Sequence, residues 1–142
     1  MSQDLVLITG GSSGIGKQLA ADYLARGALV VIVADQVERL AAAEASLRKV
    51  SASVFSVACD IGDRQAVLHM SEVVTQTYGC PDILINNAGF ATYRTFEASS
   101  SDELERLIEV NLLGAMRCTK AFLPQMIARR HGAIANMAVS TQ

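Results

Sequence analysis

The chain has 142 residues, 51% of them hydrophobic, and a formal net charge of −2 at pH 7. This length allows one domain with a real hydrophobic core, so we expect a single domain over residues 1–142. The small net charge and the lack of a long run of Lys and Arg exclude nucleic acid and membrane surfaces as partners, because both require a concentrated basic patch.

The N-terminal segment lacks the basic stretch and apolar core of a signal peptide, and no uncharged apolar run reaches the roughly 18 residues that cross a bilayer. Cys59, Cys80 and Cys118 are widely spaced and form no Cys-x-x-Cys pair, which is typical of reduced thiols. We therefore expect a cytoplasmic location.

Continuous apolar runs alternate with helical patterns along the chain. The runs predict strands at 5–8, 29–33, 54–58, 83–85 and 133–139. Because these runs lack polar alternation, they indicate a parallel sheet that is buried on both faces. Helical periodicity predicts helices over 14–26, 37–50, 63–78 and 101 to about 130. The last begins at a capping box, Ser100 with Glu103, and Pro124 is expected to bend or break it.

This order of elements predicts an α/β fold, a doubly wound parallel sheet of five strands. Right-handed crossovers favour the strand order 3-2-1-4-5. A ligand crevice is then expected at the carboxyl ends of the strands, between strands 1 and 4, where the order reverses.

The glycine-rich stretch "TGGSSGIGK" (9–17) joins the first strand to the first helix. Glycines at such a turn let the backbone approach a phosphate, and the helix N-terminus attracts its negative charge. Read from Gly11, the stretch nearly matches the loop G-x-x-x-x-G-K-S/T of nucleoside triphosphatases, but Gln18 replaces the hydroxyl residue that would bind magnesium. Read from Gly10, the spacing is that of a dinucleotide-binding turn with a wider first gap.

Two further sequence features favour the dinucleotide. Asp35 ends the second strand, close to the offset at which an acidic residue binds the ribose hydroxyls of the cofactor. The sequence "NNAG" (86–89) ends the fourth strand on the other side of the predicted crevice, although Asn and Gly there also suit an ordinary turn. In the triphosphatase interpretation, "NNAG" has no role.

Four ordered motifs, "TGGSSGIG", "CDI" (59–61), "NNAG" and "VNLLGAMRCTKAFLPQM" (110–126), resemble the short-chain dehydrogenase/reductase family in its classical branch, over nearly the whole chain. The resemblance implies a Rossmann-type fold that binds NAD or NADP and moves hydride between the nicotinamide and a small carbonyl or alcohol substrate. In this pattern the turn residues cradle the pyrophosphate, Asp60 meets the adenine, and "NNAG" lines the adenosine ribose and the sheet centre. The implied cofactor-binding residues are Thr9, Gly10, Ser12, Ser13, Gly14, Ile15, Gly16, Asp35, Asp60, Ile61, Asn87, Ala88 and Gly89.

The identity of the dinucleotide depends on charge near the end of the second strand. Many NADP-dependent family members carry Arg or Lys at the positions that Asp35 and Ser13 occupy here. A carboxylate at Asp35 would accept hydrogen bonds from ribose hydroxyls but would face the 2′-phosphate of NADP, and two such charges about 4 Å apart near a surface repel by up to about 4 kcal/mol before screening. We therefore expect NAD rather than NADP.

The catalytic groups are only partly present. Asn111 lies within an apolar helical stripe, where an Asn is usually structural, but in the family pattern it matches the Asn of the proton relay. The family's general acid and its Lys partner occur as Tyr-x-x-x-Lys. Here Tyr23, Tyr78 and Tyr93 are followed four residues later by Gly27, Asp82 and Glu97.

The catalytic Ser of the family belongs at the fifth strand, where this chain has Ala138 and Val139. Ser140 is one residue late, so it would serve only if a bulge or the strand end redirected its side chain. We therefore expect a family member that lacks the last two strands and is inactive alone.

Two alternatives remain open: a non-catalytic NAD-binding module and, less favoured, a nucleotide hydrolase. No metal site is expected around His69 or His131. The helix from 101 to about 130 resembles the family's interface helix, so we expect a homo-oligomer.

Overall fold

Five strands form one parallel sheet in the predicted order, β3-β2-β1-β4-β5. The computed structural model describes residues 3–138. Its strands are β1 Leu5–Thr9, β2 Leu29–Ala34, β3 Val54–Ala58, β4 Ile83–Asn86 and β5 Ala133–Asn136. Its helices are α1 Gly14–Ala25, α2 Val37–Leu47, α3 Arg64–Thr77, α4 Ser101–Ile108 and α5 Ala115–Ala128, with a π-helical segment, η1 Glu109–Gly114, between the last two. The predicted class and strand order are confirmed.

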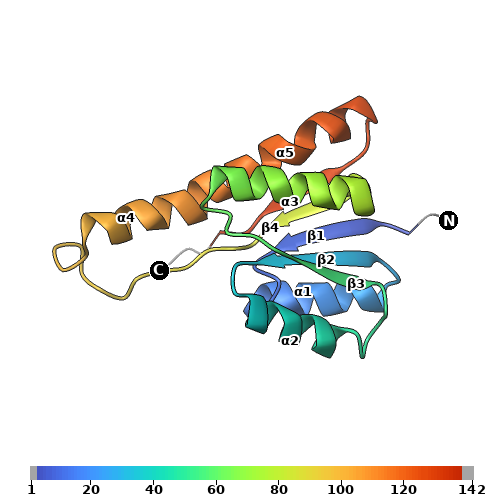
Figure 1. Cartoon of the computed structure of the whole chain (residues 1–142), viewed down its shortest axis with the longest axis horizontal. Helices are drawn as coiled ribbons and strands as arrows, with labels where there is room; N and C mark the ends of the chain where they lie inside the picture. Colours follow the sequence, from blue (N-terminus) through green and yellow to red (C-terminus); the bar gives the residue numbers. More distant parts are fainter. Residues whose placement is uncertain (1–2, 139–142) are drawn as a thin grey trace.

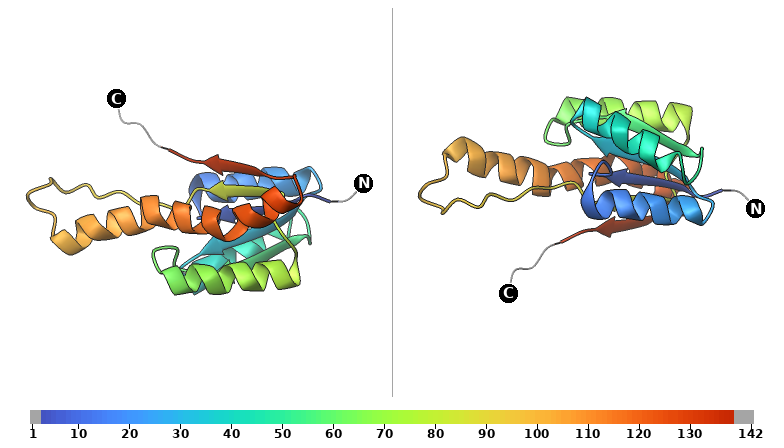
Figure 2. Two further views of the ribbon diagram at one scale, coloured as in Figure 1. Left: turned by 90° about the horizontal axis from the view of Figure 1, so that it is seen from above. Right: turned by 90° about the horizontal axis from the view of Figure 1, so that it is seen from below.

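Strand β1 explains why the strands are continuous apolar runs. Val6 and Ile8 belong to a core shared with α1 and α2, whereas Leu5 and Leu7 belong to a second core shared with α3 and α5. Successive side chains of a strand point to opposite faces, so a sheet covered on both faces needs apolar residues at every position. Figures 1 and 2 show the two helical layers on either side of the sheet.

The chain is helical from Ser101 to Ala128, but its irregular turn is not at Pro124. The predicted break at Pro124 is wrong, because α5 continues past it to Ala128. Pro124 and Lys120 are both exposed, so the carbonyl that the proline leaves without a helical donor can face solvent. The helix widens instead at η1, which contains Asn111.

Helix α4 projects beyond the sheet together with the segment that precedes it (Figure 1). It has no buried residue, and it begins at the predicted capping box. The Ser100 hydroxyl accepts the N–H of Glu103 at 3.1 Å, and the Glu103 carboxylate accepts the N–H of Ser100 at 2.8 Å. Local hydrogen bonds therefore start this helix, not burial.

Strand β5 lies at the edge of the sheet and is mostly exposed, with only Ile134 half-buried. It ends at Asn136, short of the predicted 139. Residues 139–142, and with them the candidate Ser140, lie outside the described residues. Over residues 3–138, no helix is both long enough and apolar enough to cross a membrane.

Candidate dinucleotide-binding crevice

A crevice with a cavity of about 390 Å³ lies where the carboxyl ends of β1, β2 and β4 meet. Eight of the residues named from the sequence line it: Gly10, Ser12, Ser13, Asp35, Asp60, Ile61, Ala88 and Gly89. The other lining residues are Val33, Ala34, Gln36, Arg39, Cys59, Phe90, Arg106 and Val110. Thr9, Gly14, Ile15, Gly16 and Asn87 are close in sequence but are not among the lining residues.

The glycine turn leaves the start of α1 open toward the crevice. Gly10 and Gly14 have φ of 68° and 56°, a left-handed conformation that favours glycine. A Cβ on Gly10 would lie 2.8 Å from the Cα of Ala88, so the turn also packs tightly against the end of β4. The N-cap Ser13 makes no side-chain hydrogen bond to the helix, and the first turn of α1 has no acidic residue. The N–H groups and the positive end of the helix dipole are therefore not neutralised by a side chain and suit an anion such as a pyrophosphate.

Thr9 and Asn87 join β1 to the end of β4 beneath the crevice. The buried Thr9 hydroxyl accepts the N–H groups of Asn87 at 3.1 Å and Ala88 at 3.0 Å. The Asn87 side-chain amide donates to the carbonyls of Thr9 and Gly10, each at 3.2 Å. In this structure these two side chains hold the turn and "NNAG" together.

Two opposite charges occupy the outer end of the crevice. Asp35 is exposed directly after β2, and Arg39, one helical turn further along the chain in α2, also lines the cavity. Sequence reasoning missed Arg39, although its spacing of four residues from Asp35 places it on the same side of a helix start. At this end of the crevice, Asp35 can therefore accept hydrogen bonds from a ligand, and Arg39 presents a positive charge.

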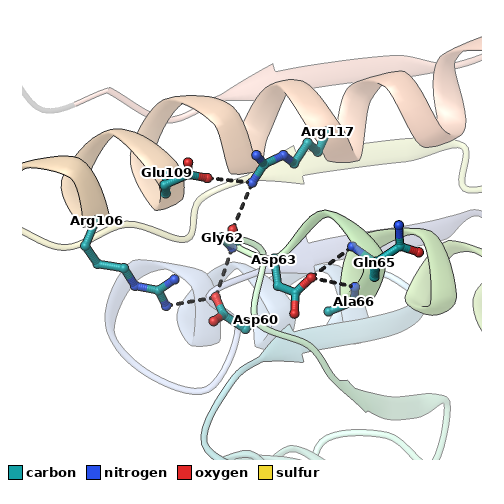
Figure 3. A network of polar contacts seen from close by, with 8 residues as sticks. All are labelled: Asp60, Gly62, Asp63, Gln65, Ala66, Arg106, Glu109 and Arg117. Atoms are coloured by element: carbon teal, nitrogen blue, oxygen red, sulfur yellow. Dashed lines mark hydrogen bonds and ion pairs between the residues drawn. The ribbon is translucent and has the colours of Figure 1, made fainter. Parts of the chain in front are cut away.

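A polar network connects the loop after β3 to the long helix, the continuous helical stretch of α4, η1 and α5 (Figure 3). The Arg106 guanidinium donates to Oδ1 of Asp60 at 2.9 Å, and the Gly62 N–H donates to the same oxygen at 2.9 Å. Burial raises the pKa of Asp60, but these hydrogen bonds and the Arg106 charge outweigh it and hold the pKa below its ordinary value. The pKa of Arg106 is raised, chiefly by its hydrogen bond to Asp60 and in smaller part by the charge of Asp35. Asp60 is thus fixed as a carboxylate at neutral pH.

The network continues on the other side of the same loop (Figure 3). Arg117 donates to the carbonyl of Gly62 and to the Glu109 carboxylate, each at 2.9 Å. Asp63 caps α3 by accepting the N–H groups of Gln65 and Ala66. The loop therefore has a fixed position between β3, α3 and the long helix.

Asn111 lies in η1 and is exposed, although the sequence pattern had placed it within an apolar stripe. Its side-chain oxygen accepts the N–H of Phe90 at 2.9 Å, and its amide donates to the Phe90 carbonyl at 2.7 Å. It lines a second cavity of about 1200 Å³, together with Asn86, Thr119 and Asn136, and Ala88 lines both cavities. Asn111 thus lies beside the crevice, at the end of β4.

The amino ends of the strands carry a separate ionic cluster of Asp4, Asp82 and His131, whose candidate ligand atoms lie within 4.8 Å of one another. One Asp82 oxygen already accepts from Arg129 at 2.9 Å and lies 3.1 Å from Nε2 of His131, and the other accepts the Leu5 N–H at 2.7 Å. A guanidinium on the central carboxylate makes this cluster an ion-pair network at the edge opposite the crevice. His69 is exposed on α3 and is not part of it.

The family model for short chain dehydrogenase matches residues 4–141. The chain belongs to the short-chain dehydrogenase family. It is 34% identical over 135 residues to bovine (Bos taurus) short-chain dehydrogenase/reductase 3, an alignment that covers 94% of this chain and 45% of that protein. The predicted family is confirmed, and this chain spans about half the length of the curated relatives that it matches.

Solved structures of the short-chain dehydrogenase family share the fold closely. The L-sorbose reductase of Gluconobacter frateurii, complexed with NADPH and L-sorbose, superposes with a TM-score of 0.88 at 36% identity, over 96% of this chain and 52% of that chain. An NAD+-bound xylitol dehydrogenase superposes with a TM-score of 0.89 at 31% identity, over 95% of this chain and 52% of that chain. The two relatives hold different dinucleotides.

Proposed function

We propose that this chain binds a nicotinamide dinucleotide, with NAD preferred, as part of a short-chain dehydrogenase that acts on a small carbonyl or alcohol. The observation that carries the proposal is the uncapped N-terminus of α1, which begins at a left-handed glycine turn and faces a crevice with Asp35 at its outer end. The residues present fit the cofactor: open helix N–H groups for the pyrophosphate and a carboxylate for the ribose hydroxyls.

Each cofactor group has a proposed partner in the crevice. Gly10, Ser12 and Ser13 would hold the pyrophosphate, Asp35 the adenosine ribose, and Asp60 with Ile61 the adenine. The bound dinucleotide would supply or accept the hydride. The chain's own residues bind and orient it, and Asn111, at the border of the second cavity, would hold a water of the proton relay.

The NAD preference rests on Asp35. Its carboxylate is exposed at the cavity, where a 2′-phosphate would meet a like charge. Relatives in this family are found with either dinucleotide, so residues of this chain must determine the choice.

Hydride transfer is proposed for the whole protein. The 142 residues contain no Tyr-x-x-x-Lys, so the role of this chain by itself would be dinucleotide binding, and the non-catalytic NAD-binding module is the second candidate. Ser140 is proposed as the donor to the substrate oxygen in the whole protein, and it lies outside the described residues. The three free cysteines fit a reducing compartment, so we propose a cytoplasmic location.

Titration of the purified chain with NADH, followed by nicotinamide fluorescence, tests the proposal. Gly14→Ala should weaken binding at least about tenfold, because alanine strains the left-handed turn at the phosphate site. Gly27→Ala is the matched control, since Gly27 also has a left-handed φ of 89° but lies at the far end of α1. Equal loss in both variants, or no NADH binding by the unmodified chain, would contradict the proposal.

Turnover assays separate the candidates. NADH binding without oxidation of any aldehyde or ketone in a panel favours the binding module for this chain, whereas hydride transfer by the purified chain favours the enzyme. Magnesium-dependent hydrolysis of ATP or GTP would instead support the nucleotide hydrolase.

A further inference from the structure

Arg106 is the residue by which the projecting helix α4 reaches the crevice. Helix α4 buries none of its residues, yet its Arg106 side chain lines the cavity that Asp35 and Asp60 also line. The Arg106 side chain is 41% exposed, and its guanidinium lies 2.9 Å from Oδ1 of Asp60. A charged group held at a fixed point on the wall of a ligand cavity is available to the ligand.

We propose that the Arg106 guanidinium forms the outer wall of the adenine pocket and stacks on the adenine ring, with Asp60 holding it in place. This inference rests on the proposed function, because it concerns the same crevice. A guanidinium is planar and weakly hydrated, and it stacks on aromatic faces more readily than an ammonium group does. The hydrogen bond to Asp60 uses one edge of that plane and does not itself occupy the face.

The surroundings of the guanidinium support this assignment. Gly62 lies so close to it that a Cβ at that position would overlap Nη1 of Arg106. The glycine therefore leaves room for the guanidinium on the loop that Asp60 begins. Ile61 and Val110, both buried and both lining the cavity, supply apolar surface in the same pocket, as an adenine ring requires.

A competing explanation is that Arg106 only holds the loop in position. Arg117 provides the matched control, because it also binds this loop, at the carbonyl of Gly62, but does not line the crevice. A loss of loop anchoring should affect nucleotide binding in both variants, whereas a direct contact should affect it in only one.

Calorimetric titration of the full chain with ADP and with NAD tests the inference. Arg106→Ala should weaken both ligands about tenfold, and Arg106→Lys should recover only part of that loss, because lysine restores the charge but not the plane. Gly62→Ala should weaken both ligands in the same direction by displacing the guanidinium. Arg117→Ala should leave the affinities within about twofold of the unmodified chain while lowering the melting temperature.

Three results would overturn the inference: unchanged ADP affinity in Arg106→Ala, equal losses in the Arg106 and Arg117 variants, or full recovery by Arg106→Lys. The melting temperature of each unliganded variant shows whether that variant folds. If Arg106→Ala does not fold, the ligand affinities of Gly62→Ala, which keeps every charge, decide whether the guanidinium contacts the nucleotide. If the unmodified chain binds neither ADP nor NAD, the proposed function fails as well. Variants that keep the unmodified affinity overturn only the role of Arg106.

Discussion

Asp35 and Arg39 place opposite charges at the proposed ribose end of the crevice. The carboxylate would accept hydrogen bonds from the 2′- and 3′-hydroxyls of NAD, whereas the guanidinium, one helical turn later, could pair with a 2′-phosphate. Asp35 directly follows β2, at the strand end that borders the proposed ribose site, so we expect its charge to dominate. Under the proposed function, Arg39 would then determine how much NADP is still bound.

Replacing Asp35 with serine should raise the affinity for NADP relative to NAD by about tenfold, because the like-charge repulsion is removed while exposure and salt limit its size. Combining this change with Arg39→Ala should cancel most of the gain. Parallel titrations with NAD and NADP at two salt concentrations provide the measurement. A ratio that Asp35→Ser leaves unchanged would show that another residue sets the preference.

Thr9 provides a second test at the residue scale, because its hydroxyl accepts two backbone N–H groups at once. Thr9→Val keeps the shape but leaves both donors without an acceptor, which should cost about 1–3 kcal/mol of unfolding free energy. Thr9→Ser keeps the hydroxyl and should retain most of the stability. Urea unfolding compares the two, and an equal loss would mean that packing by the Thr9 methyl matters more than the hydrogen bonds.

Among the elements, the long helix shows which structural features can be predicted from sequence patterns and which cannot. Its start at Ser100 was predictable, because a capping box is a local interaction. The π-helical turn was not, because its Asn111 binds Phe90 and the neighbouring Arg117 of α5 binds Gly62, and both contacts join residues far apart in the chain. Pro124 misled the prediction because its effect depends on whether the freed carbonyl meets water.

The same reasoning applies to the crevice. Strand and helix periodicity predicted the sheet order and, through it, which strand ends meet, so the residues of the glycine turn and Asp35 could be located from sequence. Arg106 could not, since a charged residue on a helix that buries nothing looks like a solvated one. Only the packing of the long helix against the loop after β3 brings it to the cavity.

Exposed apolar residues along the long helix predict self-association. Ile108, Leu112, Met116, Leu123 and Ile127 are 54%, 52%, 58%, 37% and 65% exposed, respectively. Their helical spacing forms one apolar strip, which a second copy could cover. Met116→Glu should therefore lower the association constant of the dimer at least about tenfold, because it places a charge at the centre of the strip.

Val37→Glu is the matched control, because Val37 is 61% exposed but lies on α2, away from the strip. It should leave the association unchanged. Sedimentation equilibrium measures both variants. A monomeric unmodified chain at high concentration would contradict the prediction, as would equal effects of the two substitutions.

In the whole molecule, the sheet and the long helix are joined at the edge of the crevice by charged groups. Asp60 binds Arg106, and Glu109 shares Arg117 with the Gly62 carbonyl (Figure 3). These contacts need ionised carboxylates, so acid should loosen the crevice edge before the apolar cores on the two faces of the sheet. The pH dependence of stability can therefore report on this junction.

The pKa of Asp60 is below its ordinary value in the folded chain, since the bonds from Arg106 and Gly62 outweigh the burial that would raise it. A carboxylate of lowered pKa stabilises the fold above its unfolded pKa of about 3.9, and that contribution disappears as the pH falls through the lower folded value. Asp60→Asn should thus reduce stability at pH 7 and flatten the decline between about pH 5 and pH 3. Urea midpoints across this range provide the measurement, with Glu72→Gln, an exposed carboxylate change on α3, as the control. If Asp60→Asn followed the unmodified curve with a constant offset, the acid sensitivity would come from other groups. Glu44 is the first of these to examine, because hydrogen bonds from Ser56 and Arg48 lower its pKa against the effect of burial.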